Sequence, residues 1–171
     1  RDLTRGSGNY TCDMNSKTAG TCTTFTRTNN IFGNNKKDTT DLATAGADAH
    51  FGLMATWDYY KNMFGRNGID GAGRKSYSRV HYGRSYQNAF WSSSCFCMTY
   101  GDGGSTFYPL VSLDVAAHEM SHGVMSREAN LTYSGESGGL NESNSDIFGT
   151  LVEFAQNSTV DVGDYWIGER I

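Results

Sequence analysis

The sequence predicts an α+β fold, in which an antiparallel, twisted sheet packs on helices and two further helices lie toward the C-terminal end. Three observations support this prediction. Short β-like segments separated by turn residues fill much of positions 1–100, a helical periodicity interrupts them at 47–64, and two helical segments follow at 112–129 and 139–156. Strands and helices that are segregated along the chain in this way are typical of α+β domains.

The N-terminal segment is irregular, and a helix follows it. Residues 1–46 are rich in Thr, Asn, Gly and Lys and contain short alternating stretches such as Thr23–Thr26. We expect short strands and loops there. From Ala47 to Phe64, apolar and aromatic side chains recur at helical spacing, and Asp48 lies near the start. This segment is therefore predicted to be the first helix.

A group of short strands is predicted after a break in the chain at Gly68–Gly73. The segments 80–82, 88–91 and 96–100 are rich in β-branched and aromatic residues and are separated by turn residues. We therefore expect them to form the strands of a meander.

Two helices are predicted in the last third of the chain. The single proline, Pro109, precedes a helical segment from Ser112 to Ala129. A second helix is expected from about Gly139 to Gln156, because its apolar residues recur on one face.

Composition and charge restrict the class of protein. A chain of 171 residues is long enough to bury a hydrophobic core as one domain. The net charge of −4 does not favour nucleic acid or an anionic membrane surface as a partner, and no apolar run approaches the roughly 18 residues that span a bilayer. The chain begins with Arg1 and has no charged-then-apolar leader, so we expect either a processed mature chain or an expressed fragment.

The four cysteines form two local pairs, Cys12 with Cys22 and Cys95 with Cys97. Three connectivities are possible, and the sequence does not choose among them. Locality favours Cys12–Cys22, and a bulge or turn at Phe96 would bring Cys95 and Cys97 within reach of each other. Free thiols packed as small apolar side chains are the alternative. Disulfides would indicate an oxidising, extracellular setting.

The residues His118-Glu119-Met120-Ser121-His122 form an H-E-x-x-H motif inside a predicted helix. Four helical residues advance by about 400°, so His118 and His122 project from nearly the same face, one turn apart. Two imidazoles at this spacing can share one zinc ion, and Glu119 lies beside them. A surface helix whose histidines are merely solvated is the alternative.

The second predicted helix offers a third ligand. Glu142 lies twenty residues after His122, across a connection that contains Gly135, Gly138 and Gly139. Asp146 is one helical turn beyond Glu142 and faces the same way. Metal-bound imidazoles usually donate their other N–H to a carboxylate, and Asp146 is placed for that role. An acidic, solvated face is the alternative interpretation.

Together, the H-E-x-x-H motif and the segment Asn141–Asp146 (N-E-x-x-S-D) resemble the thermolysin family of gluzincin peptidases. The resemblance extends from about Ala47 to the C-terminus and is weak before that. It also includes the segments Asn88–Trp91, Tyr100–Gly103 and Asp146–Phe154. The chain does not match the metzincins, because Met125 and Glu128 stand where their Gly and third His would be.

The resemblance implies a role for each matching residue of the centre. His118, His122 and Glu142 would bind one catalytic zinc ion. Glu119 would be the general base, and Asp146 would be the partner of His118. Tyr133 matches a tyrosine that contacts the substrate carbonyl or its oxyanion.

Residues that bind the peptide substrate are implied in the same way. Asn88 and Ala89 match the edge strand along which the peptide lies. Phe107, Leu110 and Val115 match the walls of the pocket for the residue after the scissile bond, which implies a preference for bulky apolar side chains there. Simple core packing of these three residues is compatible with that role.

A structural calcium ion is also implied, because four acidic residues match family positions that bind one: Asp114, Glu153, Asp164 and Glu169. Carboxylate oxygens are the hard ligands that calcium requires. Ordinary solvated carboxylates are the alternative.

The domain organisation implied by the resemblance is incomplete. We expect residues 1–171 to form a single thermolysin-like N-terminal catalytic domain, with the helical C-terminal domain absent from this chain. In the family that second domain supplies a histidine that stabilises the transition state and an arginine that binds the substrate. His50 and His81 occupy other positions in the family pattern.

The predicted function is therefore that of a zinc-dependent endopeptidase that hydrolyses extracellular proteins. One alternative is a zinc-binding half-enzyme that is inactive without a complementary C-terminal domain or chain. The other is a zinc aminopeptidase. This class needs an acidic anchor for the free amine near the edge strand, and Asn88–Trp91 offers none.

Overall fold

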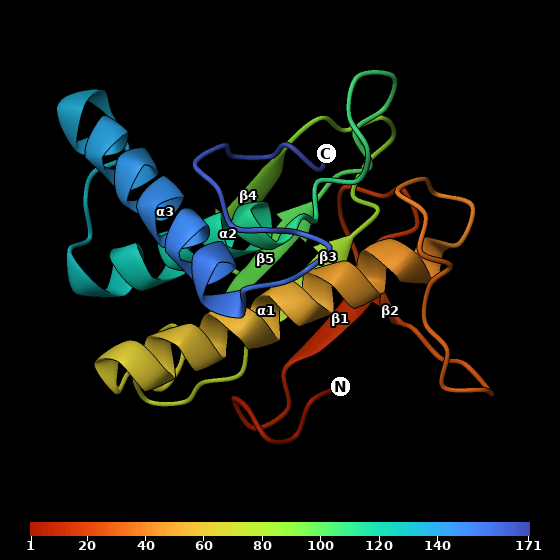
Figure 1. The fold of residues 1–171 in the computed structure, drawn as a ribbon, viewed down its shortest axis with the longest axis horizontal. Helices are drawn as coiled ribbons and strands as arrows, with labels where there is room; N and C mark the ends of the chain where they lie inside the picture. Colours follow the sequence, from red (N-terminus) through yellow and green to blue (C-terminus); the bar gives the residue numbers. More distant parts are fainter.

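The computed structural model describes all of residues 1–171 and confirms the α+β class (Figure 1). The elements, in chain order, are β1 (Tyr10–Asp13), β2 (Thr23–Thr24), α1 (Leu42–Phe64), β3 (Tyr77–Val80), β4 (Ala89–Ser92), β5 (Cys97–Tyr100), α2 (Leu113–Glu128) and α3 (Gly135–Gln156). None of the three helices combines the length and the apolar character that crossing a membrane requires.

The sheet has the strand order β2-β1-β3-β5-β4 and is mixed. The two outer pairs, β1 with β2 and β4 with β5, are antiparallel, whereas β1 with β3 and β3 with β5 are parallel. The prediction of an antiparallel sheet was therefore wrong for the inner pairs. Parallel pairing needs a long crossover, which α1 provides between β1 and β3, and strand composition alone does not reveal this connection.

Two of the helices begin earlier than predicted. Helix α1 starts at Leu42, because the side chain of Asp41 accepts a hydrogen bond from the Ala43 backbone N–H and so caps the first turn. Helix α3 starts at Gly135, so the expected glycine-rich connection is largely the first turn of the helix. A Cβ atom at Gly138 would lie 3.2 Å from the backbone of Tyr133, so this glycine serves close packing.

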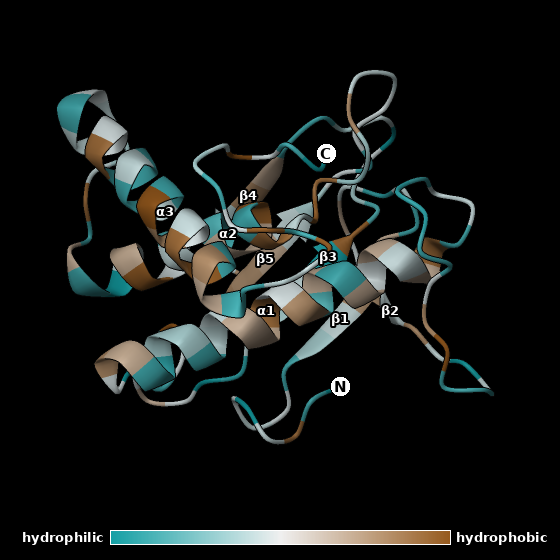
Figure 2. Cartoon of the chain, in the orientation of Figure 1, coloured by the Kyte–Doolittle hydropathy of each residue, from teal (hydrophilic) through white to brown (hydrophobic).

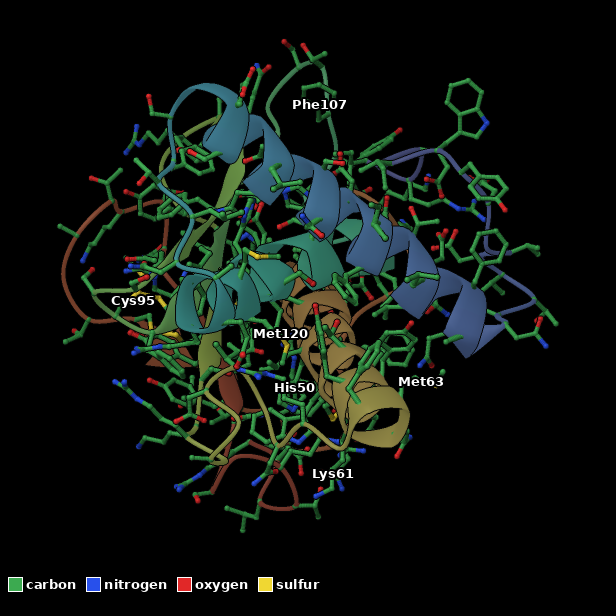
Figure 3. The ribbon with its side chains drawn as sticks, turned by 90° about the vertical axis from the view of Figure 1, so that its left-hand side faces the viewer. His50, Lys61, Met63, Cys95, Phe107 and Met120 are labelled. Carbon is green, nitrogen blue, oxygen red and sulfur yellow. A yellow bond between two sulfur atoms is a disulfide. The ribbon has the colours of Figure 1, made fainter.

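The main core lies between the sheet and the helices α1 and α2. A cluster of 14 buried residues connects the sheet with both helices and includes Leu53 and Trp57 of α1, Met98 of β5 and Met120 of α2. The hydropathy colouring shows that each helix carries both hydrophobic and hydrophilic residues (Figure 2). Met120 is fully buried, so the H-E-x-x-H motif is anchored to the core from within (Figure 3).

Both of the local disulfides are present. Cys12 is bonded to Cys22, and Cys95 is bonded to Cys97, with Cα–Cα distances of 5.5 and 5.3 Å. Phe96 has a φ angle of 55°, which makes the turn that brings Cys95 and Cys97 together. No free cysteine remains, so the free-thiol alternative was wrong.

The buried His81 connects the start of α1 to the loop that follows β5. Its Nδ1 lies 2.7 Å from Asp102 Oδ1 and its Nε2 lies 2.8 Å from the Leu42 carbonyl oxygen. Both partners are acceptors, so the doubly protonated ring donates to both. Burial alone would lower the pKa of His81, but the hydrogen bond and charge of Asp102 outweigh it, and this pKa is raised.

We expect the substitution Asp102→Asn to destabilise the fold more at pH 6 than at pH 9. Because the pKa of His81 is higher in the folded state than in the unfolded state, the charged ring contributes to the stability of the fold. This contribution is complete below the unfolded pKa of about 6.5 and is lost as the pH rises through the folded pKa. The loss at pH 6 should be about 1.5–3 kcal/mol, the typical strength of a hydrogen bond to a charged group. Denaturant unfolding at both pH values measures it, and the difference should vanish in a His81→Asn background. An equal loss at both pH values would contradict the assignment of a charged His81.

Candidate metal centre

Three potential metal ligands converge between helices α2 and α3. His118 and His122 lie one turn apart on α2, and Glu142 projects from α3. The two histidine Nε2 atoms are 2.9 Å apart, and each lies 3.3 Å from a carboxylate oxygen of Glu142. Ligand atoms on one tetrahedral zinc ion, bonded at about 2.0–2.2 Å, lie about 3.3 Å from one another. The spacing of these three groups therefore fits zinc.

Hydrogen bonds orient both imidazole rings toward this point. Nδ1–H of His118 donates to Asp146 Oδ1 at 2.7 Å, as the sequence predicted for this carboxylate. Nδ1–H of His122 donates to Asn141 Oδ1 at 2.7 Å, and Ser145 Oγ lies 3.0 Å from the same nitrogen. Each Nε2 atom is thus left with its lone pair directed toward the shared point, as a metal ligand requires.

The electrostatic environment also favours a neutral imidazole at His122. Burial lowers the pKa of His122, the nearby His118 lowers it further, and the hydrogen bond to Asn141 opposes this shift. A neutral ring is the form that binds a metal. Sequence reasoning missed the roles of Asn141 and Ser145, which stand one helical turn apart on the side of α3 that meets α2.

Glu119 lies beside the three ligands and is almost completely buried, with 6% exposure. Its Oε2 atom has no hydrogen-bond partner. Burial raises the pKa of Glu119 to about 8, the charge of Glu142 contributes to the rise, and the backbone N–H of Trp91 opposes it. A divalent cation close to Glu119 would favour the ionised form of this carboxyl group. Because Glu119 Oε2 has no partner within the protein, it is available to accept a hydrogen bond from a group that enters the site.

These residues open into a cavity of about 620 Å³ between strand β4 and the two helices. Tyr133 donates a hydrogen bond from its hydroxyl to Glu142 Oε1 at the rim of the cavity. The cavity is lined by Asn88, Ala89, Phe90, Trp91, Ser93, His118, Glu119, His122, Ser126, Asn130, Leu131, Tyr133, Asn141 and Glu142. The structure thus brings the predicted edge-strand residues together with the metal ligands.

Three predicted substrate residues do not line this cavity. Leu110 belongs to the main core, and Val115 is half-buried against that core. Phe107 is partly exposed on the loop between β5 and α2 (Figure 3). Core packing, which is compatible with a role in a pocket wall, describes Leu110 and Val115 well.

A second group of carboxylates lies at the other end of α3. Oxygen atoms of Asp114, Glu153 and Glu169 lie within 4.8 Å of one another. Asp114 and Glu153 are fully buried, and each has one oxygen without a hydrogen-bond partner. Burial raises the pKa of Glu153 to about 7, and the charges of Asp114 and Glu169 contribute. The side chain of Asp164 lies outside this group and accepts a hydrogen bond from the Trp166 backbone N–H.

The fold and the metal centre define the class of the zinc metalloproteases. Comparison with protein families makes the assignment specific. The model described as thermolysin metallopeptidase, catalytic domain, matches residues 1–126, and the model of the family's alpha-helical domain matches residues 129–171. The chain belongs to the thermolysin family of metallopeptidases.

Individual relatives agree with this assignment. The chain is 60% identical over 170 residues to the transglutaminase-activating metalloprotease of Streptomyces mobaraensis, covering 99% of this chain and 22% of that protein. It is 44% identical over 173 residues to the thermostable neutral protease NprT of Geobacillus stearothermophilus, covering 100% of this chain and 30% of the relative. Among solved structures, the precursor of protealysin from Serratia proteamaculans superimposes with a TM-score of 0.76 at 35% identity, covering 94% of this chain and 48% of that one. The chain thus spans less than a third of the length of these two curated relatives.

Proposed function

We propose that this chain carries the metal-binding part of a zinc-dependent endopeptidase that hydrolyses peptide bonds in extracellular proteins. The observation that carries the proposal is the convergence of His118, His122 and Glu142 on one point, with the buried carboxylate of Glu119 beside it. The two disulfides support an oxidising, extracellular setting.

The residues divide the chemistry among them. His118, His122 and Glu142 would hold the zinc ion, which when bound supplies Lewis-acid polarisation of the scissile carbonyl and an activated water. Glu119 accepts the proton of the attacking water and delivers it to the leaving amine. The Tyr133 hydroxyl, at the rim of the site, donates a hydrogen bond to the developing oxyanion.

The peptide would bind along strand β4, which is an edge of the sheet. An edge strand has free backbone N–H and C=O groups that can pair with an extended peptide. Asn88 and Ala89 lie at the start of this strand and line the cavity. A preference for bulky apolar residues after the scissile bond rests on the family resemblance at Phe107, Leu110 and Val115.

The test of this function is the cleavage of an internally quenched peptide by zinc-loaded protein, measured before and after removal of zinc by a chelator. We expect cleavage inside the peptide that stops on chelation and returns when zinc is added back. Removal of single N-terminal residues would instead identify an aminopeptidase. The only carboxylates that line the cavity are Glu119 and Glu142, so no further acidic group is placed to bind a free amine.

We also propose that residues 1–171 act as one catalytic unit, which further helices of the alpha-helical domain that begins in residues 129–171 complete. Helix α3 supports this, because four apolar residues at helical spacing lie partly exposed along one stripe: Leu140, Ile147, Leu151 and Phe154. A stripe of this kind is normally covered by a partner element. In the half-enzyme alternative, residues 1–171 alone bind zinc and cleave peptides about 10²–10³-fold more slowly than the longer protein, the usual effect of losing one oxyanion donor.

A structural calcium ion is proposed at the carboxylate group of Asp114, Glu153 and Glu169. Unpartnered, fully buried carboxylate oxygens at Asp114 and Glu153 support it, because burying such groups without a cation or a donor is unfavourable. Asp164 contributes its backbone N–H, which donates to Glu153 Oε2 at 3.3 Å, and its carboxylate would need to turn toward the ion.

We expect calcium to raise the melting temperature of the protein in proportion to the logarithm of its concentration above the dissociation constant. The substitution Glu153→Gln should abolish this response, whereas Glu136→Gln, an exposed residue in the first turn of α3, should leave it unchanged. Thermal unfolding with and without calcium, after removal of all metals and reloading with zinc, measures the effect. A response of equal size in the Glu153→Gln variant would place the ion elsewhere.

A further inference from the structure

We propose that the Cys95–Cys97 disulfide positions the wall of the substrate cleft, by holding Phe96 beneath Trp91 at the end of strand β4. The inference rests on the proposed function, because it assigns Trp91 to the cleft in which the peptide binds. Cys95, Phe96 and Cys97 are positioning residues in this account, since they act only through Trp91.

The disulfide closes the turn between β4 and β5. Cys97 is the first residue of β5 and pairs with Ser92 at the end of β4. The ring contains one intervening residue, Phe96, whose φ angle of 55° is unfavourable for a residue with a Cβ atom. Without the covalent ring, other turn conformations become accessible to this segment.

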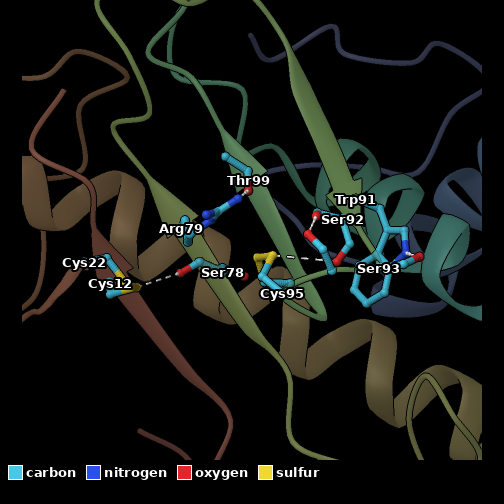
Figure 4. The surroundings of a disulfide bond; sticks show 11 residues. Cys12, Cys22, Ser78, Arg79, Trp91, Ser92, Ser93, Cys95 and Thr99 are labelled. Atoms are coloured by element: carbon cyan, nitrogen blue, oxygen red, sulfur yellow. Dashed lines mark hydrogen bonds between the residues drawn. A yellow bond between two sulfur atoms is a disulfide. The ribbon is translucent and has the colours of Figure 1, made fainter. Parts of the chain in front are cut away.

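Global stability is a weaker explanation for this disulfide. The entropic stabilisation from a cross-link grows with the length of the loop that it closes. The Cys12–Cys22 bond joins residues ten positions apart, whereas Cys95 and Cys97 are only two apart. The shorter ring therefore restricts the unfolded chain less, and its main effect is on local geometry. In Figure 4, Cys95 lies next to Ser92, and Trp91 and Ser93 lie beyond Ser92.

Phe96 transmits the constraint of the disulfide into the protein. The ring is 2% exposed, and the guanidinium groups of Arg74 and Arg127 lie over it at 4.0 and 5.2 Å from its centroid. Its edge-to-face partner is Trp91, with ring centroids 5.2 Å apart and an interplanar angle of 76°. Aromatic pairs in this geometry attract each other beyond the effect of area burial.

Trp91 in turn connects the turn to the metal centre. A Cβ atom at Gly123 would lie 3.2 Å from the Trp91 indole, so this ring packs directly on α2 beside His122. Trp91 also lines the cavity that holds the metal ligands. Through Phe96 and Trp91, the disulfide thus holds the end of the edge strand against helix α2 at one wall of the cavity.

The expected consequence of losing the disulfide is weaker peptide binding with little change in the chemical step. Without the disulfide, the cleft wall becomes ordered only when the peptide binds, so the entropy cost of fixing the backbone of about one residue reduces the affinity for the peptide. This cost predicts a KM raised about five- to thirtyfold. The zinc ligands lie on α2 and α3 and keep their own hydrogen bonds, and of the catalytic groups only Glu119 loses a contact, with the backbone N–H of Trp91, so kcat should fall by less than the rise in KM.

The experiment compares the full-length, zinc-loaded protein with three variants: Cys95→Ser/Cys97→Ala, the matched control Cys12→Ala/Cys22→Ser, and Phe96→Leu, which keeps the disulfide. KM and kcat are measured on an internally quenched peptide. The dissociation constant of a fluorescein-labelled peptide is measured by anisotropy in a Glu119→Gln background, so that binding is followed without turnover.

The inference predicts that KM and the dissociation constant rise in Cys95→Ser/Cys97→Ala, rise less in Phe96→Leu, and stay unchanged in the Cys12–Cys22 control. Unchanged binding in both cleft variants would overturn it, and so would equal losses in all three. If Cys95→Ser/Cys97→Ala fails to fold, Phe96→Leu decides the question alone. A wild-type protein that binds the labelled peptide but does not cleave would contradict the proposed function and leave the binding comparison intact.

Discussion

Replacement of Glu119 by Gln is expected to lower kcat/KM for peptide hydrolysis by about 10²–10⁴-fold, the usual contribution of a general acid–base group, with zinc still bound. The amide has nearly the size of the carboxylate but cannot accept the proton of the attacking water. Because Glu119 is not one of the three converging ligands, its loss should not release the metal.

Two measurements on each purified protein check this prediction, the rate of peptide cleavage and the zinc content. Glu136→Gln is the matched control, because this exposed glutamate lies in the first turn of α3, outside the cavity. Full activity in Glu119→Gln would exclude this carboxylate as the base. Loss of zinc together with activity would instead make it a ligand or a folding determinant.

The substitution His122→Ala is expected to abolish both zinc binding and peptide cleavage. It removes one of the three protein ligands, and the remaining two, His118 and Glu142, are too few for a catalytic zinc site. Asp146→Asn should reduce zinc affinity only in part, because the asparagine keeps an oxygen that accepts the hydrogen bond from His118 Nδ1–H but lacks the negative charge of the carboxylate. Losses of this kind typically reduce metal affinity by about 10–100-fold.

A competition titration with a fluorescent zinc chelator distinguishes these outcomes. His50→Ala serves as the control, because this histidine lies on α1, outside the cavity. Its Nδ1 atom lies 3.1 Å from Thr11 Oγ1. Zinc affinity in His122→Ala equal to that of the wild type would remove His122 from the ligand set. An Asp146→Asn variant without any loss would show that the ring of His118 is held by packing alone.

The metal ligands could be predicted from the sequence because their geometry is local. The spacing of His118 and His122 fixes two ligands on one helix face, and helical periodicity carries Glu142 and Asp146 to the same side of α3. Only the approach of α2 to α3 is non-local, and the motif itself implied that approach. The distances between Glu142 and both histidines agree with this.

Features that depend on non-local packing were missed or misplaced. The parallel pairing of β1 with β3 depends on the crossover through α1, which strand patterns do not encode. The hydrogen bond of Asn141 to His122 needs the register between α2 and α3, and an asparagine next to a glutamate gives no signal of it. The substrate role of Leu110 stays a prediction, because this residue packs in the core and apolar character alone does not separate a pocket wall from the interior.

Zinc stoichiometry tests whether His118, His122 and Glu142 form one zinc site. The protein is stripped of metal, dialysed against a small excess of zinc with calcium present, and analysed by atomic emission. We expect one zinc ion per chain in the wild type and none in a variant that carries both His118→Ala and His122→Ala. A wild-type chain that retains no zinc, or a double variant that retains a full equivalent, would contradict it.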